Sequence, residues 1–141
     1  MRAGDLMTPN PITVPPTTGI FEARELMAKE RIRHLLVTEG ELLVGIVTDR
    51  DIRLNLPSQA TSLSVWELNH LLHRLTVGEV MTRAVITVEP ERDAREAAQI
   101  ILDHKIGALP VLEGRQIVGI LTETDFVLGF MQTAATRAAR F

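Results

Sequence analysis

Two stretches of this chain carry the same sequence pattern, and this internal repeat constrains the fold more than any other feature. Residues 6–52 are repeated as residues 80–126 without a gap, at a constant offset of 74 (80 − 6). Met7-Thr8 aligns with Met81-Thr82, and Val44-Gly45-Ile46 aligns with Val118-Gly119-Ile120. A duplicated unit that cannot bury its own apolar face packs against its neighbour. We therefore expect one core and a pseudo-twofold cleft between the copies.

Length and charge limit the classes of protein to consider. A chain of 141 residues has the size of one ordinary domain, so both copies are expected in a single compact body. Hydrophobic residues make up 45% of the chain but aromatic residues only 4%, which predicts an aliphatic core. A net charge of −3 provides no general attraction to nucleic acid or anionic lipid, so neither is an expected partner.

The chain contains no cysteine, which excludes disulfides, thiolate nucleophiles and thiolate metal sites. This composition suits the reducing cytoplasm. No apolar run approaches the roughly 18 residues of a spanning helix, and the first residues lack the apolar centre of a signal peptide. We expect a cytoplasmic protein without membrane contact.

Each copy shows the order β-α-β-β-α, which predicts an α+β fold. A short extended piece precedes an amphipathic helix, and a hairpin with a Gly-containing turn precedes a second helix. Thr48 and Thr122 stand at the N-cap positions of these second helices. The expected segments are 12–14, 20–27, 35–37 and 42–47 in the first copy, and 85–88, 94–101, 109–111 and 116–121 in the second.

The predicted domain boundaries follow from the repeat. Residues 1–60 form the first repeat, 61–76 a connecting helix, 77–134 the second repeat and 135–141 a C-terminal tail. A stretch rich in Pro, Ser, Gln and Thr at 57–62 precedes the helix, in which Ser64 and Glu67 form a capping-box pair. The predicted buried stripe of this helix is Val65, Leu68, Leu71, Leu72 and Leu75.

The segments Leu109-Pro110-Val111, 45–51 and 119–125 resemble those of tandem CBS (cystathionine-β-synthase) domains. Arg33-His34-Leu35 and the leucine-rich helix are similar, more narrowly, to the small stand-alone CBS proteins of the bacterial acetoin-utilisation type. The resemblance implies two CBS repeats packed pseudo-twofold into one CBS-pair module. Its cleft would bind AMP, ADP, ATP or S-adenosylmethionine without reacting with it, no cofactor would be required, and modules would pair as homodimers. Leu36 departs from the family pattern, which favours a proline there.

The resemblance also assigns roles to residues. Asp51 and Asp125 would accept hydrogen bonds from ribose hydroxyls, and Thr48 and Thr122 would bind phosphate together with N–H groups at the helix start. Candidates for adenine contacts are Thr13, Pro16, Thr87 and Pro90. The copies differ in charge, because the cationic or titratable residues Arg33, His34 and Arg50 become Gly107, Ala108 and Thr124. A polyphosphate is therefore expected to prefer the first copy.

Each assignment has a structural alternative. The Thr-x-x-Asp pairs could simply cap their helices, and the arginines could be solvated surface charges or dimer contacts. Gly45 and Gly119 could admit a ligand close to the strand or could relieve crowding between helices and sheet. The helical spacing of Glu67, His70 and His73 suggests two metal ligands but lacks a third, so no metal site is predicted.

Two hypotheses of function follow. The first is a regulatory module that senses an adenine nucleotide or other adenosyl ligand and signals to a regulated protein partner. The alternative is a ligand-free dimerisation or scaffold module that recruits a partner protein. No pairing of base and nucleophile and no phosphate-loop lysine is evident, so an enzyme is not expected.

Overall fold

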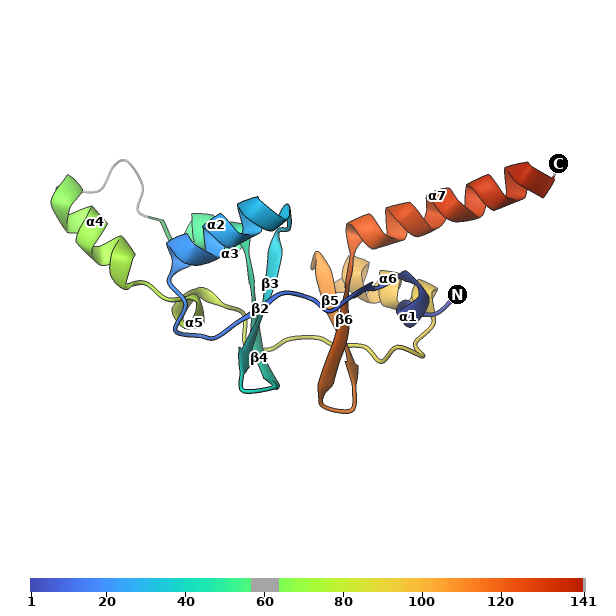
Figure 1. Ribbon diagram of the computed structural model, residues 1–141, viewed down its shortest axis with the longest axis horizontal. Coiled ribbons are helices and arrows are strands. Elements are labelled where there is room, and N and C mark those ends of the chain that lie inside the picture. The colour runs from blue at the N-terminus through green and yellow to red at the C-terminus, as the bar shows by residue number, and fades with distance from the viewer. Residues whose placement is uncertain (57–63, 141) are drawn as a thin grey trace. The chain divides into compact units, whose positions relative to one another are not determined.

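The computed structural model describes residues 1–56 and 64–140, and it divides into two compact units (Figure 1). The 12–85 unit is continuous in sequence, whereas the 86–141 unit also contains the first 11 residues. The repeat boundaries place those 11 residues with the first copy. In the structure they pack with the second copy instead, so the compact units are not the sequence repeats.

The 12–85 unit has the predicted β-α-β-β-α order. Its three-stranded sheet has the order β2-β3-β4, with β2 parallel to β3 and β3 antiparallel to β4. The hairpin and the helix that follows it are confirmed at the predicted positions (Figure 1). The elements are β2 (Thr13–Val14), α2 (Ile20–Glu30), β3 (His34–Glu39), β4 (Leu42–Thr48), α3 (Asp49–Leu54), α4 (Val65–Arg74) and α5 (Val77–Val80).

The 86–141 unit has a sheet of order β1-β6-β5, in which both strand pairs are antiparallel. The predicted extended piece at 85–88 contributes only an isolated parallel bridge, between Val88 and Val111. Residues 135–140, expected in a separate tail, continue the last helix, and residue 141 lies outside the described residues. The elements are α1 (Ala3–Leu6), β1 (Thr8–Pro9), α6 (Ala94–His104), β5 (Ala108–Glu113), β6 (Gln116–Thr122) and α7 (Glu123–Arg140).

Buried aliphatic side chains form a separate cluster in each unit, not the single core expected from the repeat. Each cluster joins the inner face of the sheet to the first helix of the repeat, because both elements bury apolar side chains at their own periodicity. A fully buried Leu or Ile stabilises the fold by roughly 1.5–3 kcal/mol. Almost completely buried members include Ile20, Leu35, Val37, Val47 and Ile52 in one unit and Ala97, Leu109, Val111 and Leu121 in the other.

Two short helices that the sequence pattern does not predict, α1 and α5, dock in the same way in the two units. The Gly4 N–H donates to the Pro90 carbonyl at 2.9 Å, and the Gly78 N–H donates to the Pro16 carbonyl at 2.9 Å. A Met-Thr pair follows each helix and pairs with the last strand of that unit: Thr8 lies opposite Ile120 in β6, and Thr82 bridges to Ile46 in β4. The repeated Met-Thr motif therefore extends each hairpin at its edge.

Gly45 and Gly119 make room for these Met-Thr segments. A Cβ atom on Gly119 would overlap the Met7 sulfur and lie 3.0 Å from the Thr8 carbonyl oxygen. Gly45 faces Met81 and Thr82 in the same way. Crowding is present at both glycines, but against the Met-Thr segments and not between helices and sheet as predicted.

Helix α4 confirms its predicted start but not its whole buried stripe. The Glu67 N–H donates to Ser64 Oγ at 3.1 Å, as expected for an N-cap. Leu72 and Leu75 pack against the core of the 12–85 unit, whereas Val65 is 80% exposed, contrary to the prediction. The helix contacts α2 through its last turn, where the ring of His73 lies 5.6 Å from that of Phe21. Val65 belongs to the first turn, at the other end of the helix. The Leu71 side chain and the stretch 57–62 lie outside the described residues.

Within the described part of the chain, no helix has the length and apolar character needed to span a membrane.

Candidate functional site

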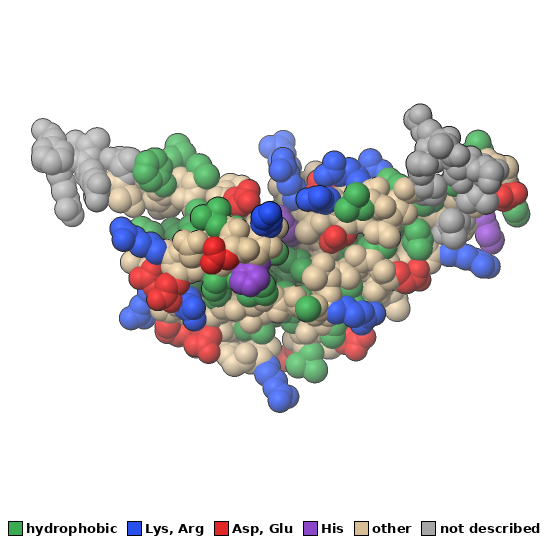
Figure 2. All heavy atoms as spheres, turned by 180° about the vertical axis from the view of Figure 1, so that it is seen from behind, with side chains coloured by type: hydrophobic (Ala, Val, Ile, Leu, Met, Phe, Trp, Pro, Cys, Tyr) green, Lys and Arg blue, Asp and Glu red, His purple; other side chains and the backbone are tan. Residues whose placement is uncertain are grey.

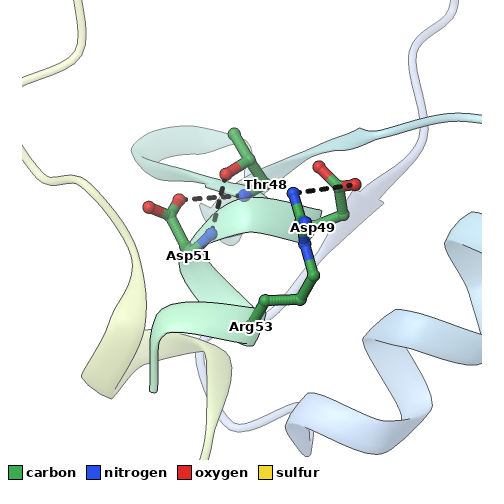
Figure 3. Close-up of polar contacts among 4 residues, drawn as sticks. All are labelled: Thr48, Asp49, Asp51 and Arg53. Carbon is green, nitrogen blue, oxygen red and sulfur yellow. Dashed lines mark hydrogen bonds and ion pairs between the residues drawn. The ribbon is translucent and has the colours of Figure 1, made fainter. Parts of the chain in front are cut away.

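The start of α3 is a reciprocal cap between Thr48 and Asp51 (Figure 3). The Thr48 N–H donates to Asp51 Oδ2 at 2.9 Å, and the Asp51 N–H donates to Thr48 Oγ1 at 3.0 Å. The capping alternative is therefore confirmed for this pair, and such a cap stabilises a helix by about 1 kcal/mol. A cap uses only part of a carboxylate, so it does not prevent a ligand from binding the remaining oxygen.

The backbone at the start of α3 offers few donors to a phosphate. The Asp49 N–H donates to the Arg33 carbonyl at 3.1 Å, and the Asp51 N–H is bonded to Thr48. Of the first three N–H groups of the helix, only that of Arg50 has no hydrogen bond to a described residue. The cap and the preceding loop therefore leave one of these three backbone donors for a phosphate, and the predicted phosphate contact of Thr48 remains a prediction.

Three residues with basic side chains, Arg33, His34 and Arg50, lie next to this cap in the chain or in the strand register. The strand register places His34 opposite Thr48, and Arg33 immediately precedes β3. Arg33 and Arg50 are exposed, and over residues 1–56 and 64–140 neither forms an ion pair. Asp49 instead pairs with Arg53 at 3.8 Å (Figure 3). We call Arg33, His34, Thr48, Arg50 and Asp51 the Asp51 cluster; the structure gathers these five predicted residues at one end of the β3–β4 hairpin.

The corresponding residues of the second copy form a more enclosed arrangement. Asp125 is the buried charged residue of the described chain, at 8% exposure. Its Oδ2 accepts the Thr122 N–H at 2.8 Å and the Thr122 hydroxyl at 3.2 Å. Its Oδ1 accepts the hydroxyl of Thr8 at 2.9 Å. We call Thr8, Thr122 and Asp125 the Asp125 cluster.

The four adenine candidates lie in the segments that precede α2 and α6. Thr13 pairs with Leu36 in the parallel register of β2 and β3, close to the Asp51 cluster. The carbonyls of Pro16 and Pro90 accept the N–H groups of α5 and α1, so both prolines have a structural role. Thr87 is exposed and lines a cavity.

That cavity, of about 490 Å³, lies at the turn end of the second hairpin. It is lined by Thr87, Val88, Glu89, Glu91, Arg92, Leu112 and Gly114. Thr122 pairs with Ala108 at the other end of β5, four residues before Leu112. Because a strand rises about 3.3 Å per residue, this separation is roughly 13 Å. The cavity is thus apart from the Asp125 cluster, although both belong to the 86–141 unit.

The histidines considered as metal ligands have other partners. His70 stacks on Trp66, with ring centroids 5.6 Å apart, and His73 Nδ1 lies 2.7 Å from the Asn69 carbonyl oxygen. No group of three potential ligand side chains is found among the described residues.

One member of the site was missed from the sequence, namely Thr8. Its hydroxyl reaches Asp125 across 117 positions of the chain. The signal for it in the sequence is the repeated Met-Thr motif, because Thr8 aligns with Thr82 in the two copies. The sequence alone gives this motif no role.

Comparison with known proteins gives consistent matches over most of the chain. The family model described as "CBS domain" matches residues 3–58 and again residues 77–131. The CBS domain-containing protein YhcV of Bacillus subtilis is 29% identical over 135 residues, covering 96% of this chain and 89% of that protein. The homoserine O-acetyltransferase of Methanocorpusculum labreanum is 36% identical over 130 residues. This chain spans only about a quarter of that enzyme's length, at 24%.

Solved structures agree with the sequence matches. The structure titled as a putative acetoin utilization protein (AcuB) from Vibrio cholerae has a TM-score of 0.82 and 30% identity, with 99% of this chain and 96% of that one covered. CBSX2 in complex with AMP has a TM-score of 0.77 and 30% identity, covering 94% and 98%. The CBS domain pair of MJ0100, in complex with 5-methylthioadenosine and S-adenosyl-L-methionine, has a TM-score of 0.77 and 27% identity, with 94% and 98% covered.

Proposed function

Because this chain belongs to the CBS domain family and carries two copies of the domain, we propose that it is a non-catalytic regulatory module that binds an adenine nucleotide or another adenosyl ligand. Two relatives of similar fold were solved with AMP or with S-adenosyl-L-methionine and 5-methylthioadenosine. We place the module in the cytoplasm, where it would report the ligand to a regulated protein partner.

The observation that carries the proposal is the Asp51 cluster. Asp51 is half-buried and held by its cap, with Oδ2 bonded to the Thr48 N–H. An ionised carboxylate fixed in this way is a good acceptor for the two hydroxyls of a ribose. Cap and carboxylate thus form a preorganised contact for the sugar.

The charges beside Asp51 favour a phosphorylated ligand. Arg33 and Arg50 lie at the same end of the hairpin and are exposed, so their guanidinium groups are accessible to a phosphate. Because the backbone donors of α3 are mostly used, phosphate binding would depend on these side chains. Arginine presents several N–H donors that match phosphate oxygens. We therefore propose AMP, ADP or ATP over S-adenosylmethionine.

Calorimetric titration of the intact chain with AMP, ADP, ATP, S-adenosylmethionine and NAD(H) tests this function. We expect binding of at least one adenine nucleotide by the wild type, and at least about tenfold weaker binding by Asp51→Asn, because a charged hydrogen-bond acceptor is lost. Arg33→Gln combined with Arg50→Gln should weaken the binding of ATP more than the binding of S-adenosylmethionine, which carries no phosphate.

Glu39→Gln is the matched control, since it removes one carboxylate charge from the exposed, opposite end of β3. It should leave affinity within about twofold of the wild type, as expected for a solvated charge far from the ligand. If folded wild-type protein binds none of the five ligands, the sensor function must be abandoned.

Exposed hydrophobic residues on α7 favour a second role, assembly with another copy of the chain. Phe130 is 72% exposed, and Figure 2 shows hydrophobic side chains along this helix next to its grey end. The exposed residues are Val127, Leu128, Phe130 and Met131. Contiguous apolar surface of this kind is typical of interfaces between protein chains. We propose that α7 contributes to a homodimer.

Sedimentation velocity tests the role of α7. The wild type should sediment as a dimer, and Phe130→Glu combined with Met131→Glu should shift it to monomer, because each change places a charge in an apolar contact. Leu102→Glu, at an equally exposed position of α6, should leave the dimer intact. A wild-type monomer, or a double variant that remains dimeric, would exclude this role of α7.

A further inference from the structure

The two Thr-x-x-Asp pairs, alike in sequence, differ in how many hydrogen bonds their carboxylates already accept. Asp125 accepts three, from the Thr122 N–H, the Thr122 hydroxyl and the Thr8 hydroxyl. Asp51 accepts one, from the Thr48 N–H on Oδ2. Across the described ranges, no donor reaches Asp51 Oδ1.

The number of accepted bonds decides what each carboxylate can still bind. A carboxylate has about four acceptor positions on its two oxygens. Asp125 has most of them filled and is 8% exposed, so a ribose hydroxyl would have to displace that of Thr8. Such an exchange gains little, because one hydrogen bond replaces another and the Thr8 hydroxyl loses its partner. Asp51 requires no displacement.

Thr8 is the residue that distinguishes the copies. Its counterpart Thr82 pairs with Ile46 as Thr8 pairs with Ile120, so the two backbones have corresponding positions. Within the part of the chain that is described, however, no hydrogen bond joins Thr82 to Asp51. The caps differ as well: Thr48 Oγ1 accepts the Asp51 N–H, whereas Thr122 Oγ1 donates to Asp125.

We propose that the adenosyl ligand binds at the Asp51 cluster alone, and that Thr8 closes the Asp125 cluster by occupying Asp125 Oδ1. The inference rests on the proposed function and adds to it the number of sites and the residue that sets this number. Thr8 is a positioning residue here: it acts through Asp125 and touches no ligand in the wild type. Removing its hydroxyl opens a second site.

Calorimetry of the full chain measures directly how many ligands bind per chain. The probe is AMP, or another nucleotide of the panel if that nucleotide binds the wild type more tightly than AMP does. Wild type and Thr8→Ser should bind one ligand per chain, since serine keeps the hydroxyl. Thr8→Val, which has nearly the same shape, should bind two. Asp51→Asn should lower wild-type affinity at least about tenfold, and Asp125→Asn less than about twofold.

Thr82→Val is the matched control, because it makes the same change at the corresponding position of the other copy; it should keep one site. Two equal sites in the wild type, one site in Thr8→Val, or equal losses in Asp51→Asn and Asp125→Asn would each overturn the inference while leaving the proposed function intact. The comparison of the two Asp variants remains decisive if Thr8→Val fails to fold. If neither the folded wild type nor any of its folded variants binds a ligand of the panel, the proposed function itself is refuted.

Discussion

Gly119→Val is expected to destabilise the chain by about 3 kcal/mol, one of the largest effects of a single substitution that we predict. The added carbons would meet the Met7 sulfur and the Thr8 carbonyl oxygen, which lies 3.0 Å from the ideal Cβ position. A side chain can rotate away, but the carbonyl belongs to a backbone paired with β6. Overpacking substitutions typically cost about 1–3 kcal/mol and occasionally more, and a clash with backbone favours the upper end of this range. Urea unfolding of wild type and variant measures the loss.

Gly19→Val is the control for this substitution. An added Cβ there has no heavy atom within 4 Å, so the change alters only the N-cap of α2. A loss of about 1 kcal/mol is expected. Gly45→Val, which meets Met81 and Thr82, should behave like Gly119→Val. If Gly119→Val costs no more than Gly19→Val, the Met-Thr segment does not pack on β6.

Asp125→Ala should cost about 3 kcal/mol of folding free energy, against about 1 kcal/mol for Asp51→Ala. Asp125 is buried and joins Thr122 to Thr8, so its removal breaks hydrogen bonds to a charged acceptor at the start of α7 and at β1. Such bonds contribute about 1.5–3 kcal/mol each. Asp51→Ala removes only one of the two hydrogen bonds of a local cap, the one from the Thr48 N–H to the carboxylate. Urea denaturation compares the two variants.

A double-mutant cycle isolates the contact between Thr8 and Asp125. Thr8→Val and Asp125→Ala should be coupled by about 1–2 kcal/mol, because both remove the same hydrogen bond. Thr82→Val and Asp51→Ala should be additive, since no hydrogen bond between them is present in the described structure. Coupling of equal size in the two cycles would contradict the asymmetry between the clusters.

Local patterns were sufficient to predict most of the secondary structure. The helical spacing of Ile20, Ala23 and Met27 predicted α2, and all three are buried. The Gly-containing turns at Gly40 and Gly114 predicted the hairpins, and both glycines have the positive φ that such turns favour. The cap of Thr48 on Asp51 was also predictable, because its partners are three residues apart.

The sequence alone thus determined the repeated β-α-β-β-α order, the caps and the charge difference between the copies, since each depends on neighbouring residues. It did not determine which hairpin each Met-Thr segment joins. Gly45 and Gly119 both stand in a Val-Gly-Ile tripeptide, so Thr8 has two equivalent partners in the sequence pattern, Ile46 and Ile120. Only the tertiary structure decided this pairing, by placing the first 11 residues with the second copy. The hydrogen bond from Thr8 to Asp125 follows from that placement and makes the two copies unequal.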